Sequence, residues 1–192
     1  MLNEELISKA REFALSESKK YGSPIYEHIV LAEDVARRLA EKLGADIEVA
    51  TIGALLMDIK QGEALRTGRV PEHAQMSADA AVTFLVEQGA SEDIIDKVEA
   101  CALYHHGTEK YPYIEAEIAA NTDCYRFLHP KGFLNITMKV NGIIGEDTAK
   151  CFEFIDSKLD EKHAILSLDV AKAELEEYYQ SSKEYIRLAL EK

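Results

Sequence analysis

The sequence predicts an all-α protein. Apolar residues recur at helical spacing in successive segments of the 192-residue chain. Many of these segments begin at a helix-capping residue and end at glycine. No segment shows the clear alternation of apolar and polar residues that is typical of a half-buried β-strand. The length is that of one domain, so we expect residues 1–192 to form a single bundle of about seven to eight helices.

Capping residues set the bounds of the helices in the N-terminal part. Gly22 follows the first predicted helix, and Ser23 and Pro24 then supply an N-cap and a proline at the first helical position of the second. Gly44 ends the second helix and Asp46 caps the third. The third is the most apolar run in the chain, and a helix that is hydrophobic all round belongs at the centre of a domain. These helices are predicted at residues 2–20, 24–43 and 46–59.

Glycine also divides the rest of the chain. Gly89 closes the fourth predicted helix, Ser91 caps the fifth and Gly107 ends it. Two segments, 60–72 and 130–147, contain several glycines and are predicted to be a polar loop and an irregular segment. The remaining helices are predicted at about residues 72–88, 92–106, 113–128, 148–159 and 167–192.

The charge balance is acidic. There are 22 Lys and Arg residues against 35 Asp and Glu, for a formal net charge of -13. Such a surface repels phosphate backbones, so no nucleic-acid polymer is expected as a partner. A small anionic substrate is still compatible with this charge where a local cluster of cations or a metal offsets the field.

Cysteine usage and hydropathy predict the compartment. Cys101, Cys124 and Cys151 are odd in number and widely spaced, which suggests neither a disulfide framework nor a CxxC zinc site. The acidic N-terminus lacks the apolar core of a signal peptide. No uncharged apolar run approaches the roughly 20 residues of a membrane span. We therefore expect a reduced, cytoplasmic protein with no membrane contact.

Several ligand-type side chains fall on apolar faces or at helix ends. A lone buried histidine is more often bonded to a carbonyl, and Asp123 is within reach of an ion pair with Arg126 three positions on. Five such groups buried together without a common partner would be costly, however. The five residues are His28, Asp58, His73, His105 and Asp123.

A shared metal ion would satisfy these side chains. Helix bundles build metal sites from side chains on facing helices. Imidazole and carboxylate ligands without thiolate suit Fe, Mn, Co, Ni or Zn. The sequence therefore predicts a divalent metal cofactor, while an all-α bundle with no site at all is the alternative.

Cations are concentrated near this predicted site. Lys60, Arg66 and Arg69 form the densest local group of cations in the chain, and Lys110 lies in the turn after Gly107. Charged groups of this kind are commonly no more than a solvated surface. The alternative is that they neutralise the phosphate of a substrate.

Five segments, in this order and spacing, resemble the motifs of the HD-domain metal-dependent phosphohydrolases. The resemblance covers about residues 20–130 and implies an HD-like helical bundle, with supporting helices at about residues 146–192. The segments are Glu27-His28-Ile29-Val30 with Ala32-Glu33-Asp34-Val35-Ala36, Gly53-Ala54-Leu55-Leu56-Met57-Asp58-Ile59, Glu72-His73-Ala74-Gln75-Met76-Ser77-Ala78, Tyr104-His105-His106-Gly107, and Glu115-Ala116-Glu117-Ile118 with Asn121-Thr122-Asp123.

The chain departs from this family at the central helix. Met57 stands where the family has the histidine of its His-Asp pair, and a thioether is a weak ligand for the divalent metals concerned. The resemblance implies a main metal set of His28, Asp58 and Asp123 that lacks its fourth ligand. It also implies a second set that is intact. The second set consists of Asp58, His73, His105 and His106.

The resemblance implies an activity as well. We expect hydrolysis of a phosphate ester or anhydride on a small molecule, in particular a nucleotide, with Asp58 and Lys60 as catalytic residues. Arg66, Arg69 and Lys110 are expected to contact the substrate phosphate. The alternative is a degenerate HD module that has lost catalysis and binds a nucleotide, a metal or another protein.

Overall fold

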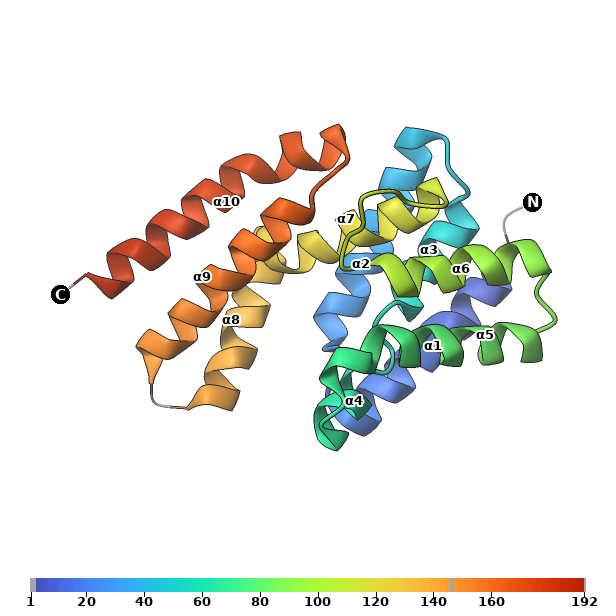
Figure 1. The fold of residues 1–192 in the computed structure, drawn as a ribbon, viewed down its shortest axis with the longest axis horizontal. Helices are drawn as coiled ribbons and strands as arrows, with labels where there is room; N and C mark the ends of the chain where they lie inside the picture. The colour runs from blue at the N-terminus through green and yellow to red at the C-terminus, as the bar shows by residue number, and fades with distance from the viewer. Residues whose placement is uncertain (1–2, 146, 192) are drawn as a thin grey trace.

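The computed structural model describes residues 3–145 and 147–191, and every regular element in that part of the chain is a helix, so the all-α prediction is confirmed (Figure 1). The helices are α1 (Glu4–Tyr21), α2 (Tyr26–Leu43), α3 (Ile47–Leu56), α4 (Gln61–Thr67), the short 3-10 helix η1 (Val70–Glu72), α5 (His73–Glu87), α6 (Glu92–Tyr104), α7 (Ile114–Leu128), α8 (Pro130–Ile144), α9 (Thr148–Ile165) and α10 (Asp169–Leu190).

Helix α3 lies at the centre of the N-terminal part of the bundle, as its composition predicts. All of its residues from Val49 to Leu56 are buried, and it packs against α1, α2, α6 and α7. A Cβ atom at Gly53 would lie 2.5 Å from the Sγ of Cys101, so glycine permits the close approach of α3 and α6. Close packing of α6 on α3 brings the end of α6 near the end of α3, where Asp58 follows.

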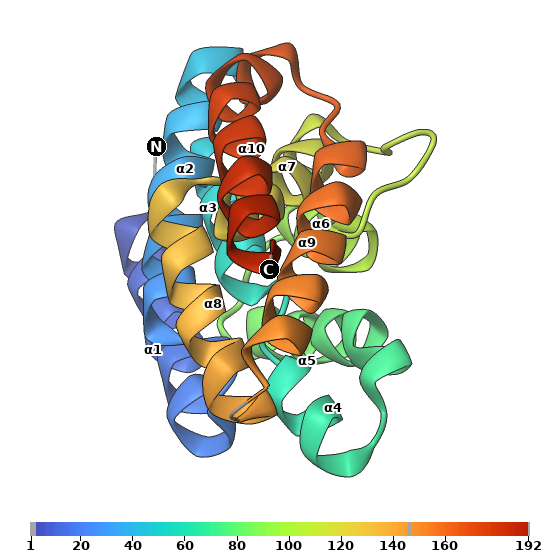
Figure 2. The same ribbon diagram turned by 90° about the vertical axis from the view of Figure 1, so that its left-hand side faces the viewer.

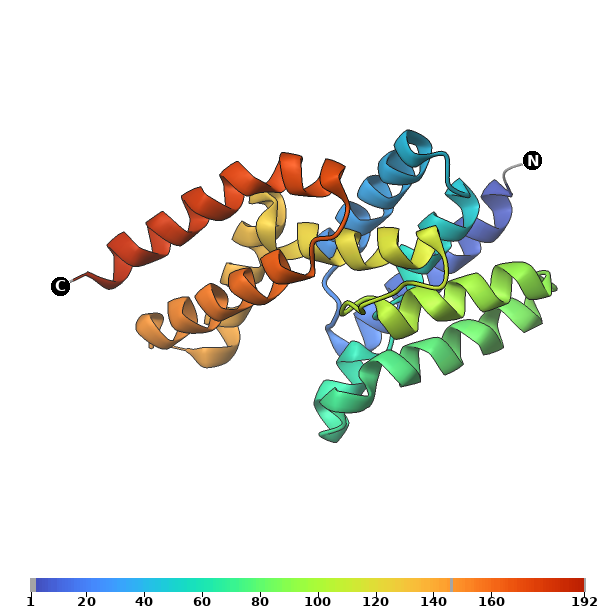
Figure 3. The same ribbon diagram turned by 45° about the horizontal axis from the view of Figure 1, so that its top comes forward.

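Helix α7 connects two groups of helices. It packs against α2, α3 and α6 on one side and against α8, α9 and α10 on the other. Figure 3 shows α8, α9 and α10 at the end of the molecule opposite to α5 and α6, with α7 running between them. Figure 2 views that end and shows the three C-terminal helices in front of the rest. No helix in residues 3–145 and 147–191 is long and apolar enough to cross a membrane.

Two segments that were predicted to be non-helical form helices. Residues 60–72 contain α4 and η1, and residues 130–147 contain α8. Helix α4 has only seven residues, too few for a helical period to show in the sequence. In α8 the breaking effect expected of glycine is offset by Pro130 at the first turn and by the side chain of His129, which accepts a hydrogen bond from the backbone of Lys131. Three other ends differ. Helix α2 begins at Tyr26 with Ile25 at the N-cap position, so the predicted cap at Ser23 and the helical Pro24 are wrong. Helix α3 stops at Leu56 and α9 continues to Ile165.

Gly132 holds the start of α8 against the end of α7. A Cβ atom there would lie 2.5 Å from the carbonyl oxygens of Tyr125 and Arg126. We expect Gly132→Ala to lower the free energy of unfolding by about 1–3 kcal/mol, because the two backbones must separate. Gly142→Ala in the same helix is the matched control, since a Cβ atom at Gly142 meets nothing within 4 Å. Urea unfolding of both variants tests this, and an equal effect of the two substitutions would contradict the packing role of Gly132.

Candidate metal centre

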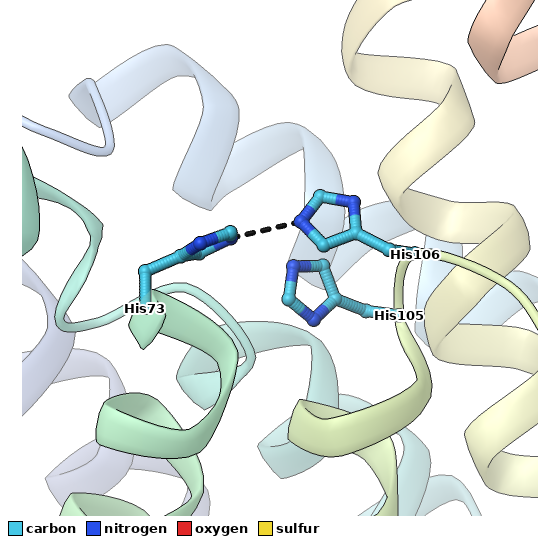
Figure 4. Close-up of side chains that lie close together, drawn as sticks. All are labelled: His73, His105 and His106. Carbon is cyan, nitrogen blue, oxygen red and sulfur yellow. Dashed lines mark hydrogen bonds between the residues drawn. The ribbon is translucent and has the colours of Figure 1, made fainter. Parts of the chain in front are cut away.

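Asp58 lies in the turn that follows α3 and is 3% exposed. Its Oδ1 atom lies 3.3 Å from Nε2 of His73 and 3.3 Å from Nε2 of His105. His73 is the first residue of α5, and His105 directly follows α6. Helices α5 and α6 pack against each other, so the two imidazoles meet at the end of α3. Figure 4 shows how the side chains of His73, His105 and His106 gather there.

Backbone carbonyls determine which ring nitrogen of each histidine carries the proton. Nδ1 of His73 lies 2.6 Å from the carbonyl oxygen of Val70, and Nδ1 of His105 lies 2.7 Å from that of Ala102. A carbonyl oxygen only accepts hydrogen bonds, so each Nδ1–H donates and each neutral ring presents a lone pair at Nε2. Metal-binding histidines are commonly oriented by a hydrogen bond of this kind at the other nitrogen.

The three acceptor atoms fit a divalent metal ion. Oδ1 of Asp58 and Nε2 of His105 are buried and have no hydrogen-bond partner. A carboxylate oxygen that faces two nitrogen lone pairs is unfavourable unless a cation lies among them. Metal–ligand bonds of about 2.1 Å place neighbouring ligand atoms about 3.0–3.4 Å apart, which matches the separations of 3.3 Å that Asp58 Oδ1 makes with His73 and His105.

His106 lies beside these three side chains but differs from them in its hydrogen bonds. Its Nε2 is 2.8 Å from Nε2 of His73, and the three histidines have ligand atoms within 4.8 Å of one another. Its Nδ1 lies 3.1 Å from the ammonium nitrogen of Lys162 on α9. Because an ammonium group only donates, a neutral His106 ring carries its proton on Nε2. In this arrangement His106 is a hydrogen-bond donor next to the candidate metal ligands.

A buried guanidinium group contacts the other oxygen of Asp58. Nη1 of Arg126 lies 2.6 Å from Oδ2 of Asp58 and 2.9 Å from Oδ1 of Asp123. The ammonium nitrogen of Lys162 lies 2.7 Å from Oδ2 of Asp123. Both oxygens of Asp123 therefore contact protein cations. The ion pair between Asp123 and Arg126, which the sequence offered as the alternative to metal binding, is present.

His28 lies on α2, at 3% exposure, and is not among the histidines that converge on Asp58 Oδ1. Its Nε2 is buried and has no hydrogen-bond partner. His28, Met57, Asp58 and Arg126 together line a cavity of about 10 Å³. That volume corresponds to about one water molecule. The structure thus separates the two predicted metal sets, with His73 and His105 on one side of Asp58 and His28 on the other.

Neighbouring charges determine the ionisation of the two buried carboxylates. Burial by itself would raise the pKa of Asp58, but the neighbouring imidazole of His105 and the guanidinium of Arg126 outweigh it and hold that pKa well below its usual range. Burial would likewise raise the pKa of Asp123, but the charges of Lys162 and Arg126 outweigh it and lower that pKa. Both carboxylates are therefore ionised at neutral pH.

Burial and the charge of Arg126 lower the pKa of His28 to about 3. An unfolded histidine titrates near 6.5. Between these two values the unfolded chain binds a proton that the folded chain does not, so stability falls as the pH decreases. We expect the titration of His28 to lower the free energy of unfolding by roughly 2 kcal/mol when the pH falls from 7 to 5.

Urea unfolding in EDTA at the two pH values measures this loss. The His28→Leu variant should lose about 2 kcal/mol less than wild type over the same pH interval, because the other titrating groups are common to both proteins. An identical pH dependence in the two proteins would contradict a neutral, buried His28.

Lys60, which was predicted to be catalytic, has other partners. Its ammonium nitrogen lies 2.7 Å from Glu17 and 3.0 Å from Glu63. The side chain therefore contacts two carboxylates of α1 and α4, and no contact joins it to the histidines. The proximity of Lys60 to Asp58 in the sequence does not bring its ammonium group into the candidate centre.

The cations predicted to contact a phosphate also lie apart from the histidines. Arg69 pairs with Glu72 at 2.6 Å, and the guanidinium of Arg66 lies 5.5 Å from the centre of the Tyr21 ring. Lys110 is exposed in the loop between α6 and α7. None of these three has a contact with Asp58 or the histidines in the described part of the chain.

Lys162 is a residue of the site that the sequence analysis did not identify. It is 1% exposed and lies on the same face of α9 as the buried residues Ile155 and Leu159. The spacing of four and then three residues places a lysine in the apolar stripe of this helix. That position was the available signal, because a lysine is almost never fully buried unless it has a partner.

Solved structures show which fold this is. A predicted HD superfamily hydrolase from an uncultured Thermotogales bacterium matches 95% of this chain and 90% of its own, with a TM-score of 0.69 and 17% identity. A Lactobacillus plantarum protein matches with a TM-score of 0.74, 16% identity and coverage of 98% and 96%. Bacillus subtilis YpgQ matches with a TM-score of 0.67, 21% identity and coverage of 96% and 94%. The chain therefore shares its fold with these proteins, one of which is a predicted HD superfamily hydrolase, and this confirms the HD-like fold that the resemblance implies.

Curated sequences give a second similarity. The chain is 28% identical over 144 residues to Ribonuclease Y of Fervidobacterium nodosum and 26% identical over 141 residues to Ribonuclease Y of Finegoldia magna. In each case the match covers 71% of this chain and 25% of the relative, so the chain spans about a quarter of the length of these proteins. No family model matches the chain.

Proposed function

We propose that the chain is a metal-dependent phosphohydrolase that acts on a phosphate ester or anhydride of a small molecule, such as a nucleotide. One observation carries the proposal. Nε2 of His73 and Nε2 of His105 each lie 3.3 Å from Oδ1 of Asp58, and two of these three atoms are buried without a hydrogen-bond partner. The HD superfamily fold, which the chain shares with a predicted hydrolase, supports it.

The metal ligands in this proposal are Asp58, His73 and His105. A divalent ion held there would supply Lewis-acid activation of water and of the phosphoryl group. The chain itself supplies orientation, because the carbonyls of Val70 and Ala102 fix the two imidazoles. His105 is fully buried, and His73 has 12% of its side chain exposed, so solvent reaches the site from the α5 side.

The charge of the centre suits a phosphate. Two carboxylates, Asp58 and Asp123, are balanced by two cations, Arg126 and Lys162, so the formal charge of these four groups is zero. A divalent ion would leave the centre with two positive charges, which complements a phosphate dianion. The exposed His106 carries its proton on Nε2 and donates it to Nε2 of His73; a metal ion bound to that nitrogen of His73 would free the N–H for a phosphate oxygen.

Cleavage of RNA is the second candidate, because the curated relatives are named Ribonuclease Y. The net charge of -13 opposes the binding of a polymer. The match also covers only 25% of those relatives. We therefore favour a small substrate, and an RNA oligonucleotide belongs in the test.

A substrate panel with added Mn²⁺, Fe²⁺, Co²⁺, Ni²⁺ or Zn²⁺ tests the proposal. It should contain nucleoside mono-, di- and triphosphates, p-nitrophenyl phosphate and a short RNA. Metal-dependent release of phosphate or pyrophosphate from a small substrate, abolished in Asp58→Asn, is the expected result. Cleavage of RNA alone would replace the small substrate with the second candidate. Metal binding without turnover of any substrate would favour a degenerate module that only binds.

A further inference from the structure

Oδ2 of Asp58 faces a protein cation rather than a free space. Arg126 contacts this oxygen and Asp123 through the same nitrogen, Nη1, at 2.6 and 2.9 Å. The arginine is 3% exposed, so water cannot readily exchange with this contact. A metal ion bound by both carboxylates would have to displace the guanidinium group from a buried position, where removal of one partner is expensive.

Both oxygens of Asp123 already contact protein cations. Its Oδ1 contacts Arg126 and its Oδ2 lies 2.7 Å from the ammonium nitrogen of Lys162, which is itself 1% exposed. Together Arg126 and Lys162 carry two positive charges, which is the formal charge of one divalent ion. The arginine comes from α7 and the lysine from α9, so the C-terminal helices contribute half of this charge.

The space on this side of Asp58 is also too small for a hydrated ion. The cavity lined by His28, Met57, Asp58 and Arg126 measures about 10 Å³, about the size of one water molecule. The thioether of Met57 is a weak ligand for divalent ions of the borderline class. His28 is a potential ligand whose Nε2 is buried without a hydrogen-bond partner, and it borders this cavity together with Arg126.

We propose that Arg126 and Lys162 replace a metal ion between Asp58 and Asp123, so that the centre takes one divalent ion and His28 is not a ligand. The two protein cations neutralise the carboxylates permanently, and the single ion binds only on the His73 and His105 side of Asp58. The statement about that single ion rests on the proposed function. The statement about Arg126 and Lys162 does not.

Titration of the EDTA-treated full chain with Mn²⁺, by calorimetry and metal analysis, tests the role of His28. His28→Leu should bind Mn²⁺ with a dissociation constant within about threefold of wild type, because His28 is not a ligand in this proposal. Loss of a true ligand would weaken binding by more than the 10–100-fold seen for supporting residues. The apolar replacement removes an unpartnered nitrogen, so the variant is expected to fold. A loss of affinity of about 100-fold or more would place His28 among the ligands and overturn the proposal.

The same titration tests the role of Arg126. The double variant M57H/R126Q removes the guanidinium and adds an imidazole beside His28, and it should bind one metal ion per chain more than wild type. The matched control M57H retains Arg126 and should bind no additional ion. An additional ion in M57H, or none in a folded M57H/R126Q, would overturn the proposal.

The two proposals fail in different ways. If wild type binds no metal, the proposed function is wrong, while the comparison of M57H/R126Q with wild type still tests Arg126. A double variant that folds only when Mn²⁺ is present, measured by thermal unfolding, supports the replacement, since binding to the folded state alone stabilises it. If the double variant does not fold even with Mn²⁺, a metal ion cannot take the place of Arg126 between the carboxylates and the proposal is wrong.

Discussion

Replacement of Arg126 by leucine is expected to lower the free energy of unfolding by about 3–5 kcal/mol, which is the effect of leaving buried charges without their partner. The guanidinium contacts Asp58 and Asp123, whose side chains are 4% and 2% exposed. Leucine fills much of the volume but leaves two neighbouring carboxylates to repel each other. Because native domains are stable by only about 5–15 kcal/mol, such a loss is large enough to unfold part of the protein at 37 °C.

Urea unfolding of the metal-free protein measures this effect. Arg69→Leu is the matched control, because Arg69 pairs with Glu72 at the surface and half of its side chain is exposed. An exposed pair contributes about 0–1 kcal/mol, so this control should remain close to wild type. If the two arginine substitutions change stability equally, the buried ion network does not support the fold in the way that we infer.

Replacement of His73 by alanine is expected to weaken metal binding more than about 100-fold, because loss of a ligand exceeds the 10–100-fold effect of a supporting residue. His73 supplies one of the two nitrogen atoms that lie 3.3 Å from Asp58 Oδ1. Its side chain is partly exposed, at 12%, so its removal leaves no closed cavity in the core. Hydrolysis of any small phosphate substrate should fall in parallel with the bound metal.

His163→Ala is the matched control for this substitution. His163 lies on α9 and pairs with Glu176 near the surface, with 34% of its side chain exposed. Calorimetric titration with Mn²⁺ should give the wild-type dissociation constant for this variant. Unchanged binding in His73→Ala, or an equal loss in both variants, would remove His73 from the centre.

Periodicity and capping residues were sufficient to predict most of the fold. The all-round hydrophobic pattern of α3 indicates its central place, and the caps at Asp46 and Ser91 both form in the structure. Helices α4 and α8 were not predicted, because one is too short to show a period and the other contains glycines. Gly132 permits close contact between the backbones of α8 and α7, and no local sequence pattern reveals such a tertiary requirement.

In the site, too, local patterns predict the position of single residues but not their distant partners. Helix spacing placed His105 on a buried face and Asp58 at the end of an apolar helix, and both are fully or almost fully buried. The partners of those groups depend on contacts between residues far apart in the chain. Asp58 and Arg126 are 68 positions apart, and His106 and Lys162 are 56 positions apart. Such pairings follow from the packing of α7 and α9, which the sequence pattern does not specify.

A crystal structure of the Mn²⁺-treated protein, with anomalous data at the manganese edge, would locate the metal ion directly. We expect a single strong peak in contact with Asp58, His73 and His105, and a guanidinium group of Arg126 still between Asp58 and Asp123. A peak in contact with His28 and Asp123, with Arg126 displaced, would contradict this expectation, and so would the absence of any peak at Asp58.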